Sequence, residues 1–230
     1  MKRVLLLKPG VTSSRAVLGD YEAWFSSRVG ARARFYPVEL HAGEAPPPRA
    51  GFDAVVMSGS PLSVTTPTEW MVRAGDYLVD AADAGAPVLG VCFGHQLLAW
   101  RLGGAVQRSP KGRELGTIAV ALTDAGRVDP LFHGLPDVIR VQSTHEDEVA
   151  PLPDGATLLA TTEHCRVQAF AWGRYARGVQ FHPEMDQAST RWLVNDPKTA
   201  LADDERQRIH AQAHDAPFGA QLLINFLERF

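Results

Sequence analysis

The sequence predicts an α/β protein with a doubly wound, mostly parallel central sheet, helices on both faces of that sheet and antiparallel strands in its second half. Two observations carry this prediction. Up to about residue 102, short apolar runs alternate with helical stretches, a pattern typical of a parallel sheet covered by helices. Beyond that residue, apolar runs follow one another across turns with little helix between them, which indicates antiparallel pairing.

The first half supplies the parallel strands and the helices that cover them. Residues 43–51 are expected to form a loop, because this segment contains three consecutive prolines. Gly85 is expected to end the second helix, and the fourth strand leads directly into the third helix. We expect strands at residues 3–8, 34–39, 53–57 and 87–91, and helices at residues 14–28, 68–84 and 94–102.

The second half supplies the antiparallel strands and a helical C-terminus. From about residue 185 the pattern is helical, with Pro197 and Pro217 breaking the run. No internal repeat and no linker is found, so residues 1–230 are expected to form a single domain with residues 185–230 as a C-terminal helical extension. The expected strands lie at residues 116–122, 138–142, 157–161, 167–172 and 178–181.

Composition narrows the class of protein. Hydrophobic residues make up 45% of the 230 residues and charged residues 21%, which is typical of a packed globular protein. The net charge is −3 and no Lys/Arg-rich block occurs, so we expect no nucleic-acid partner. No apolar run approaches the roughly 20 residues needed to cross a bilayer. We therefore expect a cytoplasmic protein without membrane contact, and two cysteines do not make a disulfide framework.

The sharpest chemical feature is Cys92, which lies between Gly90 and Gly94 where an apolar strand meets a helix. This G-x-nucleophile-x-G form is typical of a nucleophile elbow, in which a tight strand-to-helix turn exposes the reactive side chain. Glycines two residues to either side leave the room that the turn requires. The helix N-terminus favours a thiolate and can bind an oxyanion. The alternative is a small buried core cysteine, so the segment alone leaves both interpretations open.

A base and an orienting group for this nucleophile are found in His182-Pro183-Glu184, at the end of an apolar run. Residues two apart in a strand face the same side, so the imidazole and the carboxylate are expected to point together toward the sheet edge. The carboxylate would fix the imidazole tautomer and stabilise the imidazolium. A structural histidine beside a solvated glutamate is the alternative.

An oxyanion hole requires backbone N–H groups from two places. One candidate is the amide of Phe93, directly after the nucleophile. The other is the amide of Gly59, in the turn that ends the third strand, at a neighbouring carboxyl end.

With these residues in place, the sequence resembles the class I, triad-type glutamine amidotransferases, in particular stand-alone single-domain members and the amidotransferase domain of GMP synthase. The resemblance covers about residues 1–185 and implies a flavodoxin-like sheet within a single glutamine amidotransferase domain. It rests on PVLGVCFGHQLLA (residues 87–99) and GVQFHPE (178–184), supported by SGSPLSV (58–64), KGRELGT (111–117) and the segment 143–173.

The resemblance implies a role for each matching residue. Cys92 would attack the γ-carboxamide and form a thioester, with His182 as general base and then acid, and Glu184 orienting His182. The amides of Gly59 and Phe93 would form the oxyanion hole. Gln96 would help to hold the glutamine. No metal and no cofactor is implied.

Two positions depart from the family pattern. Ser60 follows Gly59 where many members have a second glycine, which affects how readily the Gly59 amide rotates. Thr144 separates Ser143 from His145 where relatives often have serine directly followed by histidine, so no role is carried over to His145.

Three functions remain open from the sequence, each with a small-molecule substrate or ligand. The first is a glutaminase-type amidotransferase that releases ammonia to a synthetase partner subunit. The second is a free-standing γ-glutamyl peptidase or hydrolase, which uses the same thioester chemistry on another leaving amine. The third is a non-catalytic binding module on the same fold.

Overall fold

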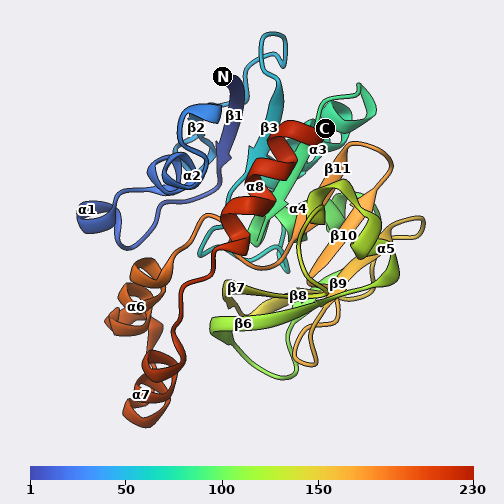
Figure 1. Ribbon diagram of the computed structural model, residues 1–230. Helices are drawn as coiled ribbons and strands as arrows, with labels where there is room; N and C mark the ends of the chain where they lie inside the picture. The colour runs from blue at the N-terminus through green and yellow to red at the C-terminus, as the bar shows by residue number, and fades with distance from the viewer.

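The apolar runs of the sequence form one nine-stranded sheet in the computed structural model, which describes all of residues 1–230 (Figure 1). The strand order is β2-β1-β3-β4-β11-β10-β9-β6-β7, and β5 pairs with β8 in a separate two-stranded sheet. The first five strands in this order are parallel and the following pairings are antiparallel, which confirms the predicted fold class. The bounds are β1 (Lys2–Lys8), β2 (Ala33–Glu39), β3 (Ala54–Met57), β4 (Val88–Val91), β5 (Val106–Arg108), β6 (Glu114–Leu122), β7 (Val138–His145), β8 (Asp147–Val149), β9 (Thr157–Thr161), β10 (Ala169–Trp172) and β11 (Ala176–Val179).

Alternating side chains of each parallel strand enter two separate cores. In β1, Val4 and Leu6 belong to one hydrophobic cluster and Leu5 and Leu7 to the other, as the two-residue period of a strand requires. Helices α2 (Tyr21–Val29) and α8 (Phe218–Arg229) cover the first face, and α3 (Glu69–Asp83) and α4 (Phe93–Arg101) cover the second (Figure 1). None of the helices combines the length and the hydropathy that a membrane span requires.

The expected helix at residues 14–28 is two helices, α1 (Arg15–Leu18) and α2. Gly19 between them has a φ of 78°, a conformation that interrupts a helix and that glycine adopts at low cost. Asp20 then accepts a hydrogen bond from the amide of Tyr21 as the N-cap of α2. The same carboxylate lies 2.8 Å from Nζ of the fully buried Lys8.

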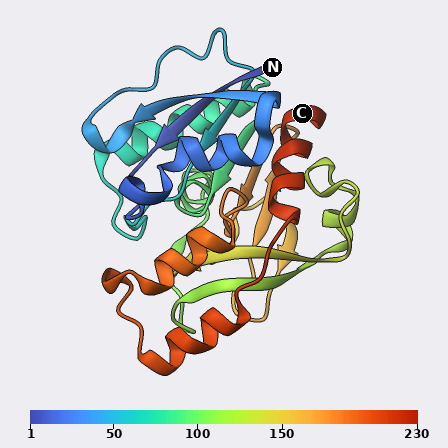
Figure 2. The same cartoon turned by 60° about the vertical axis from the view of Figure 1, so that its left-hand side comes forward.

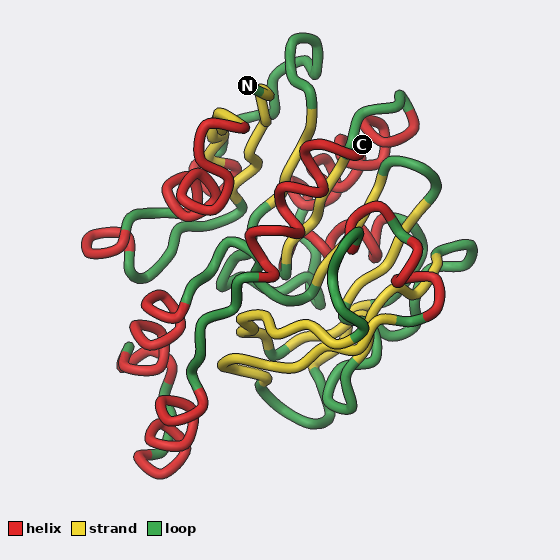
Figure 3. Tube along the Cα trace, viewed as in Figure 1, coloured by secondary structure: helices red, strands yellow, loops and turns green.

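The sheet twists strongly between its parallel and antiparallel parts. In Figure 3 the parallel strands run roughly from top to bottom, whereas β6 and β7 run across the view. Two features of this half were not predicted: the three-residue strands β5 and β8, and the short helix α5 (Asp124–Val128). The last parallel strand, β11, ends at Val179 rather than at residue 181.

The C-terminal extension is helical, as the sequence predicts, and packs on the sheet at two places. Helices α6 (Gln187–Asn195) and α7 (Asp203–Gln212) lie beside β6, where Ile209 covers Gly116 (Figure 2). Helix α8 places Leu222 and Phe226 in the same core cluster as β1 and β4. We infer that the extension and the sheet fold as one unit, because they share this core.

Candidate active site

The strained residue of the site is Cys92, at the junction of β4 and α4. Its backbone has φ 49° and ψ −99°, a conformation that L residues rarely adopt. A Cβ atom at Gly90 would lie 2.5 Å from the carbonyl oxygen of Gly94, and one at Gly94 would lie 2.5 Å from the carbonyl oxygen of Met57. Both glycines are therefore required by close packing, and the turn is a nucleophile elbow in shape.

The elbow holds the thiol at the wall of a cavity of about 720 Å³. The amide of Cys92 donates to the carbonyl of Val179 at 2.9 Å, which joins the ends of β4 and β11. Its Sγ lies 3.6 Å from the carbonyl oxygen of Thr144, which also lines this cavity. The thiol also stands at the N-terminus of α4, whose first amides have no acceptor within the helix.

His182 and Glu184 come together beside this thiol, although not by the predicted route. Both residues lie beyond the end of β11, so alternation along a strand does not align them. Nδ1 of His182 lies 2.7 Å from Oε1 of Glu184, and both side chains are buried. The amide of His182 donates to the carbonyl of Gln142 in β7 at 2.8 Å, which fixes the segment against the antiparallel strands.

The charge state of His182 follows from its neighbours. Burial alone lowers the pKa of an imidazole, but the negative charges of Glu184 and Cys92 raise the pKa of His182 well above its ordinary value. His182 is therefore an imidazolium at neutral pH. Its Nε2 is buried and makes no hydrogen bond, which leaves this nitrogen available for proton exchange.

Gly59, in the turn after β3, lies against His182 and Cys92. A Cβ atom at this position would lie 2.7 Å from Cε1 of His182 and 3.5 Å from Cβ of Cys92. A side chain would thus displace the imidazole. Ser60 holds the turn in place, because its hydroxyl donates to the carbonyl of Pro9 at 3.2 Å and accepts from the amide of Leu62 at 3.1 Å.

Gln96 lines the cavity from the first turns of α4 and is held at its amide nitrogen. Nε2 donates to the carbonyl of Asp147 at 2.9 Å and to Oε1 of Gln180 at 3.1 Å. Phe93 starts α4, and its buried ring stacks on Trp70 with a centroid distance of 6.2 Å. The six residues expected from the sequence thus lie around one cavity or immediately behind its wall.

The family follows from this arrangement together with the sequence. The family model described as glutamine amidotransferase class-I matches residues 26–194. The chain belongs to this family. The resemblance drawn from the two signature segments is thereby confirmed.

Three relatives illustrate the sequence similarity to class I glutamine amidotransferases and how much of each chain it covers. The glutamine amidotransferase-like protein YfeJ of Salmonella typhimurium is 35% identical over 92% of this chain and 90% of YfeJ. Gamma-glutamyl peptidase 3 of Arabidopsis thaliana is 32% identical over 77% of this chain and 75% of the peptidase. A glutamine-hydrolyzing GMP synthase subunit of Sulfurisphaera tokodaii is 38% identical over 58% of this chain and 68% of that relative.

A solved structure shares the fold along the whole chain. A glutamine amidotransferase from Thermotoga maritima matches with a TM-score of 0.80 and 24% identity, over 100% of this chain and 98% of that chain. The C-terminal helices, for which the sequence offers no motif, are therefore included in the structural match.

Several residues of the amidotransferase cavity were missed by sequence reasoning. They come from four places: the loop after β1, the loop before β6, the junction of β7 and β8, and the C-terminal extension. They line one cavity because the chain returns to it. The carboxyl ends of β1 and β3, where such sheets bind ligands, lie at this opening. These residues include Thr12, Ser13, Arg113, Glu146, Asp147, Leu193, Asp196 and Lys198.

The C-terminal extension also supports the His182–Glu184 segment from behind. A Cβ atom at Gly219, in α8, would lie 2.6 Å from the carbonyl oxygen of Pro183 and 2.9 Å from its Cα. The side chain of Gln142 accepts a hydrogen bond from Thr190 at 2.9 Å and donates to the carbonyl of His214 at 2.9 Å. Gln142 is the residue whose carbonyl binds the amide of His182, so the extension holds that strand too.

Cys165 differs from Cys92 in its backbone setting and in its surroundings, although both thiols are buried. It is fully buried, and burial and the nearby carboxylate of Glu114 raise the pKa of its thiol to about 12. It follows β9 in an ordinary loop and has no helix N-terminus. This agrees with a structural rather than a reactive cysteine.

Replacing Gly219 by alanine is expected to reduce activity more than stability. The added methyl group must displace the Pro183 backbone between His182 and Glu184, at a cost of about 1–3 kcal/mol in unfolding free energy. A misplacement of the base by a fraction of an ångström should lower the turnover rate about 10- to 100-fold. Turnover and chemical denaturation measure the two effects.

Gly75→Ala in α3 is the matched control, because its added Cβ would meet only the flexible side chain of Arg101 at 3.1 Å. That variant should keep its activity. If Gly219→Ala loses stability and keeps full turnover, α8 does not support the base.

Glu184→Gln is expected to shift the pH dependence of thiol reactivity. The amide can still accept from Nδ1, but removal of the carboxylate charge lowers the pKa of His182, so less imidazolium is present at neutral pH. The rate of Cys92 alkylation by iodoacetamide should therefore fall at least about tenfold between about pH 6 and pH 7, and approach the unsubstituted rate at higher pH. Cys165→Ala serves as the control for labelling at the second thiol, and an unchanged profile in Glu184→Gln would contradict the charge coupling.

Proposed function

We propose that the protein hydrolyses γ-glutamyl amides through a thioester on Cys92, with Cys92, His182 and Glu184 as its catalytic triad. The observation that carries this proposal is the 2.7 Å contact between His182 and Glu184, which lies beside a thiol held in a strained elbow. A nucleophile, a base and an orienting carboxylate are the three parts that such catalysis requires. Membership of a family of enzymes supports the same conclusion.

The proposed reaction has two halves. Sγ of Cys92 attacks the amide carbon, and His182 gives its proton to the departing nitrogen as the carbon–nitrogen bond breaks. A γ-glutamyl thioester and a free amine result. Water then attacks the thioester while His182 accepts its proton, so that glutamate leaves and the thiolate of Cys92 is regenerated beside the imidazolium of His182.

The amides of Gly59 and Phe93 are proposed to bind the oxyanion in both halves. Support comes from their positions. A Cβ atom at Gly59 would lie 3.5 Å from Cβ of Cys92, and Phe93 opens α4, where the amides of the first turn have no acceptor within the helix. Gln96 is proposed to hold the glutamyl group, because it lines the cavity one helical turn after Cys92.

Glutamine is the simplest donor, and ammonia is then the amine that leaves. Transfer of that ammonia to a synthetase partner subunit is supported by the likeness to the GMP synthase subunit of Sulfurisphaera tokodaii, whose name describes one part of an assembly. We place the reaction in the reducing cytoplasm, because a catalytic thiol has to remain reduced.

A second candidate, a free-standing γ-glutamyl peptidase, is favoured by one observation. The cavity of about 720 Å³ lies within the range that accommodates drug-sized ligands and exceeds what glutamine fills. Arg108, Arg113 and Lys198 lie on its walls. Both arginines pair with Glu146, and the three cations together offer partners for the carboxylate of a peptide leaving group. The similarity to gamma-glutamyl peptidase 3 points in the same direction.

Cys92→Ala is expected to abolish turnover and to leave the fold intact. The loss is chemical, because the side chain is small and no large cavity forms, so hydrolysis should fall by at least about 10³-fold with little change in melting temperature. Hydrolysis is measured on a panel of glutamine and γ-glutamyl dipeptides, and mass spectrometry follows the adduct of a glutamine-like electrophile on Cys92.

Each result of this panel decides between the candidates. Ammonia release from glutamine supports the glutaminase, and cleavage of dipeptides without ammonia release supports the peptidase. Neither activity, together with no adduct on Cys92, would mean that the fold serves as a non-catalytic binding module.

A further inference from the structure

A second buried pair of ionisable side chains borders the cavity, next to the proposed triad, and one of its members, His145, lines the cavity. Glu114 in β6 and His145 in β7 face each other directly in the register of the two strands. Nε2 of His145 lies 2.9 Å from Oε2 of Glu114, and the two side chains are 1% and 9% exposed, respectively. Burying two charges is costly, so such a pair needs further polar partners.

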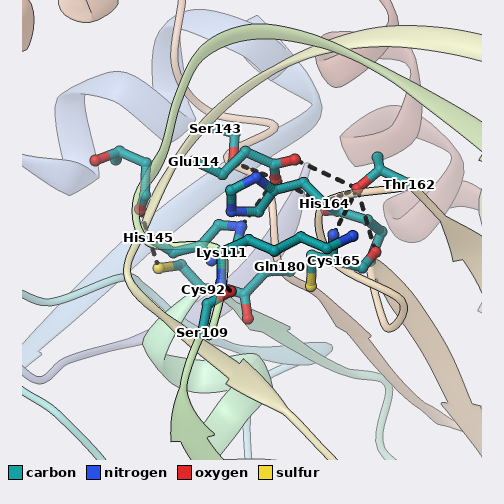
Figure 4. Close-up of polar contacts among 12 residues, drawn as sticks. Cys92, Ser109, Lys111, Glu114, Ser143, His145, Thr162, His164, Cys165 and Gln180 are labelled. Carbon is teal, nitrogen blue, oxygen red and sulfur yellow. Dashed lines mark hydrogen bonds and ion pairs between the residues drawn. The ribbon is translucent and has the colours of Figure 1, made fainter.

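Glu114 has those partners, which come from β7 and from the loop between β9 and β10 (Figure 4). Its Oε2 accepts from Gln168 at 2.7 Å and from Ser143 at 3.3 Å, and its Oε1 accepts from Thr162 at 3.3 Å. Burial alone raises the pKa of a carboxyl group, but the hydrogen bond and the charge of His145, with the bond from Gln168, hold the pKa of Glu114 below its ordinary value. Glu114 is thus an anion at neutral pH.

His145 connects the anchored Glu114 carboxylate to Asp147 in the cavity wall. Its second ring nitrogen, Nδ1, lies 3.0 Å from the carbonyl oxygen of Asp147. A carbonyl and an ionised carboxylate can only accept hydrogen bonds, so each ring nitrogen of His145 faces an acceptor. The ring is a rigid link of fixed length between Glu114 and the Asp147 carbonyl.

The wall that this link supports makes the contacts to the reacting residues. The Asp147 carbonyl also accepts from Nε2 of Gln96, and the carbonyl of Thr144 faces Sγ of Cys92 at 3.6 Å. The carbonyl oxygen of Asp147 is therefore contacted by two side chains that line the cavity, His145 and Gln96. A shift of His145 moves this carbonyl and with it the carboxamide of Gln96.

We propose that the Glu114–His145 pair is a positioning unit for the γ-glutamyl donor, which holds the Asp147 carbonyl and thereby fixes Gln96 in the cavity wall. The proposal rests on the proposed function, since Gln96 is taken to meet the glutamyl group. It assigns no chemical step to His145, whose ring nitrogens are both engaged, one by Glu114 and the other by the Asp147 carbonyl.

The test compares two reagents for Cys92 in the full-length protein. Iodoacetamide is small and requires no donor site, whereas a glutamine-like diazoketone must bind as the donor does before it alkylates the thiol. In Glu114→Gln we expect the rate with the diazoketone to fall about 10-fold or more and the rate with iodoacetamide to change by less than about threefold. For hydrolysis of the donor, KM should rise about as much, with kcat less affected.

His145→Gln provides the second variant, because its amide can still donate to Glu114 but cannot also reach the Asp147 carbonyl. The same selective loss is expected. The matched control is Asp129→Asn, which weakens the buried Arg177–Asp129 pair outside the cavity, where Nη2 and Oδ2 lie 2.9 Å apart. It should lower the melting temperature and leave the ratio of the two labelling rates unchanged.

Each remaining outcome decides one claim. If both reagents lose the same factor in Glu114→Gln and His145→Gln, or if both variants fail to fold, the pair serves the fold alone and the positioning proposal is overturned. If the diazoketone fails to label the unsubstituted protein while iodoacetamide reacts with Cys92, the proposed function fails and the positioning claim falls with it for that separate reason.

Discussion

The backbone of Cys92, at φ 49° and ψ −99°, is the constraint on which the site depends. Strain of this kind persists only where the surroundings enforce it. Here the enforcement is close packing, because neither Gly90 nor Gly94 has room for a Cβ atom, and because the Cys92 amide is tied to Val179 in β11. The same bond fixes where β11 ends, and therefore where the chain turns toward His182. The position of the proposed nucleophile and that of the proposed base thus both depend on the pairing of β4 with β11.

The proposed base is positioned by the antiparallel half of the sheet rather than by its own strand. His182 follows β11 and is bound at its amide by Gln142 of β7, while Glu184 returns to its Nδ1 across a turn that contains Pro183. On the same β7 strand, His145 carries the link from Glu114 to the cavity wall. One strand therefore connects the proposed base with the proposed donor site, which explains why a mixed sheet suits this chemistry.

The sequence predicts the parallel half well, because its signals are local. Alternating apolar runs and Gly-bounded turns determine β1, β3 and β4, and the elbow glycines mark Cys92. The break at Gly19 is missed because an isolated glycine does not by itself end a helical pattern. Glu114 and Gly219 could not be assigned from sequence. Their relation to the site arises from strand register and from the return of α8, which are properties of the assembled fold.

The contact of Gly219 with Pro183 has a consequence for how the protein becomes active during its synthesis. Because chains emerge from the ribosome N-terminus first, the strands and the Cys92 segment are synthesised before α8, which completes the core that they share. The helix that presses on the His182–Glu184 segment is translated after every residue of the proposed triad. A nascent chain can thus contain all of these residues and still lack the contact between α8 and the segment that carries the proposed base.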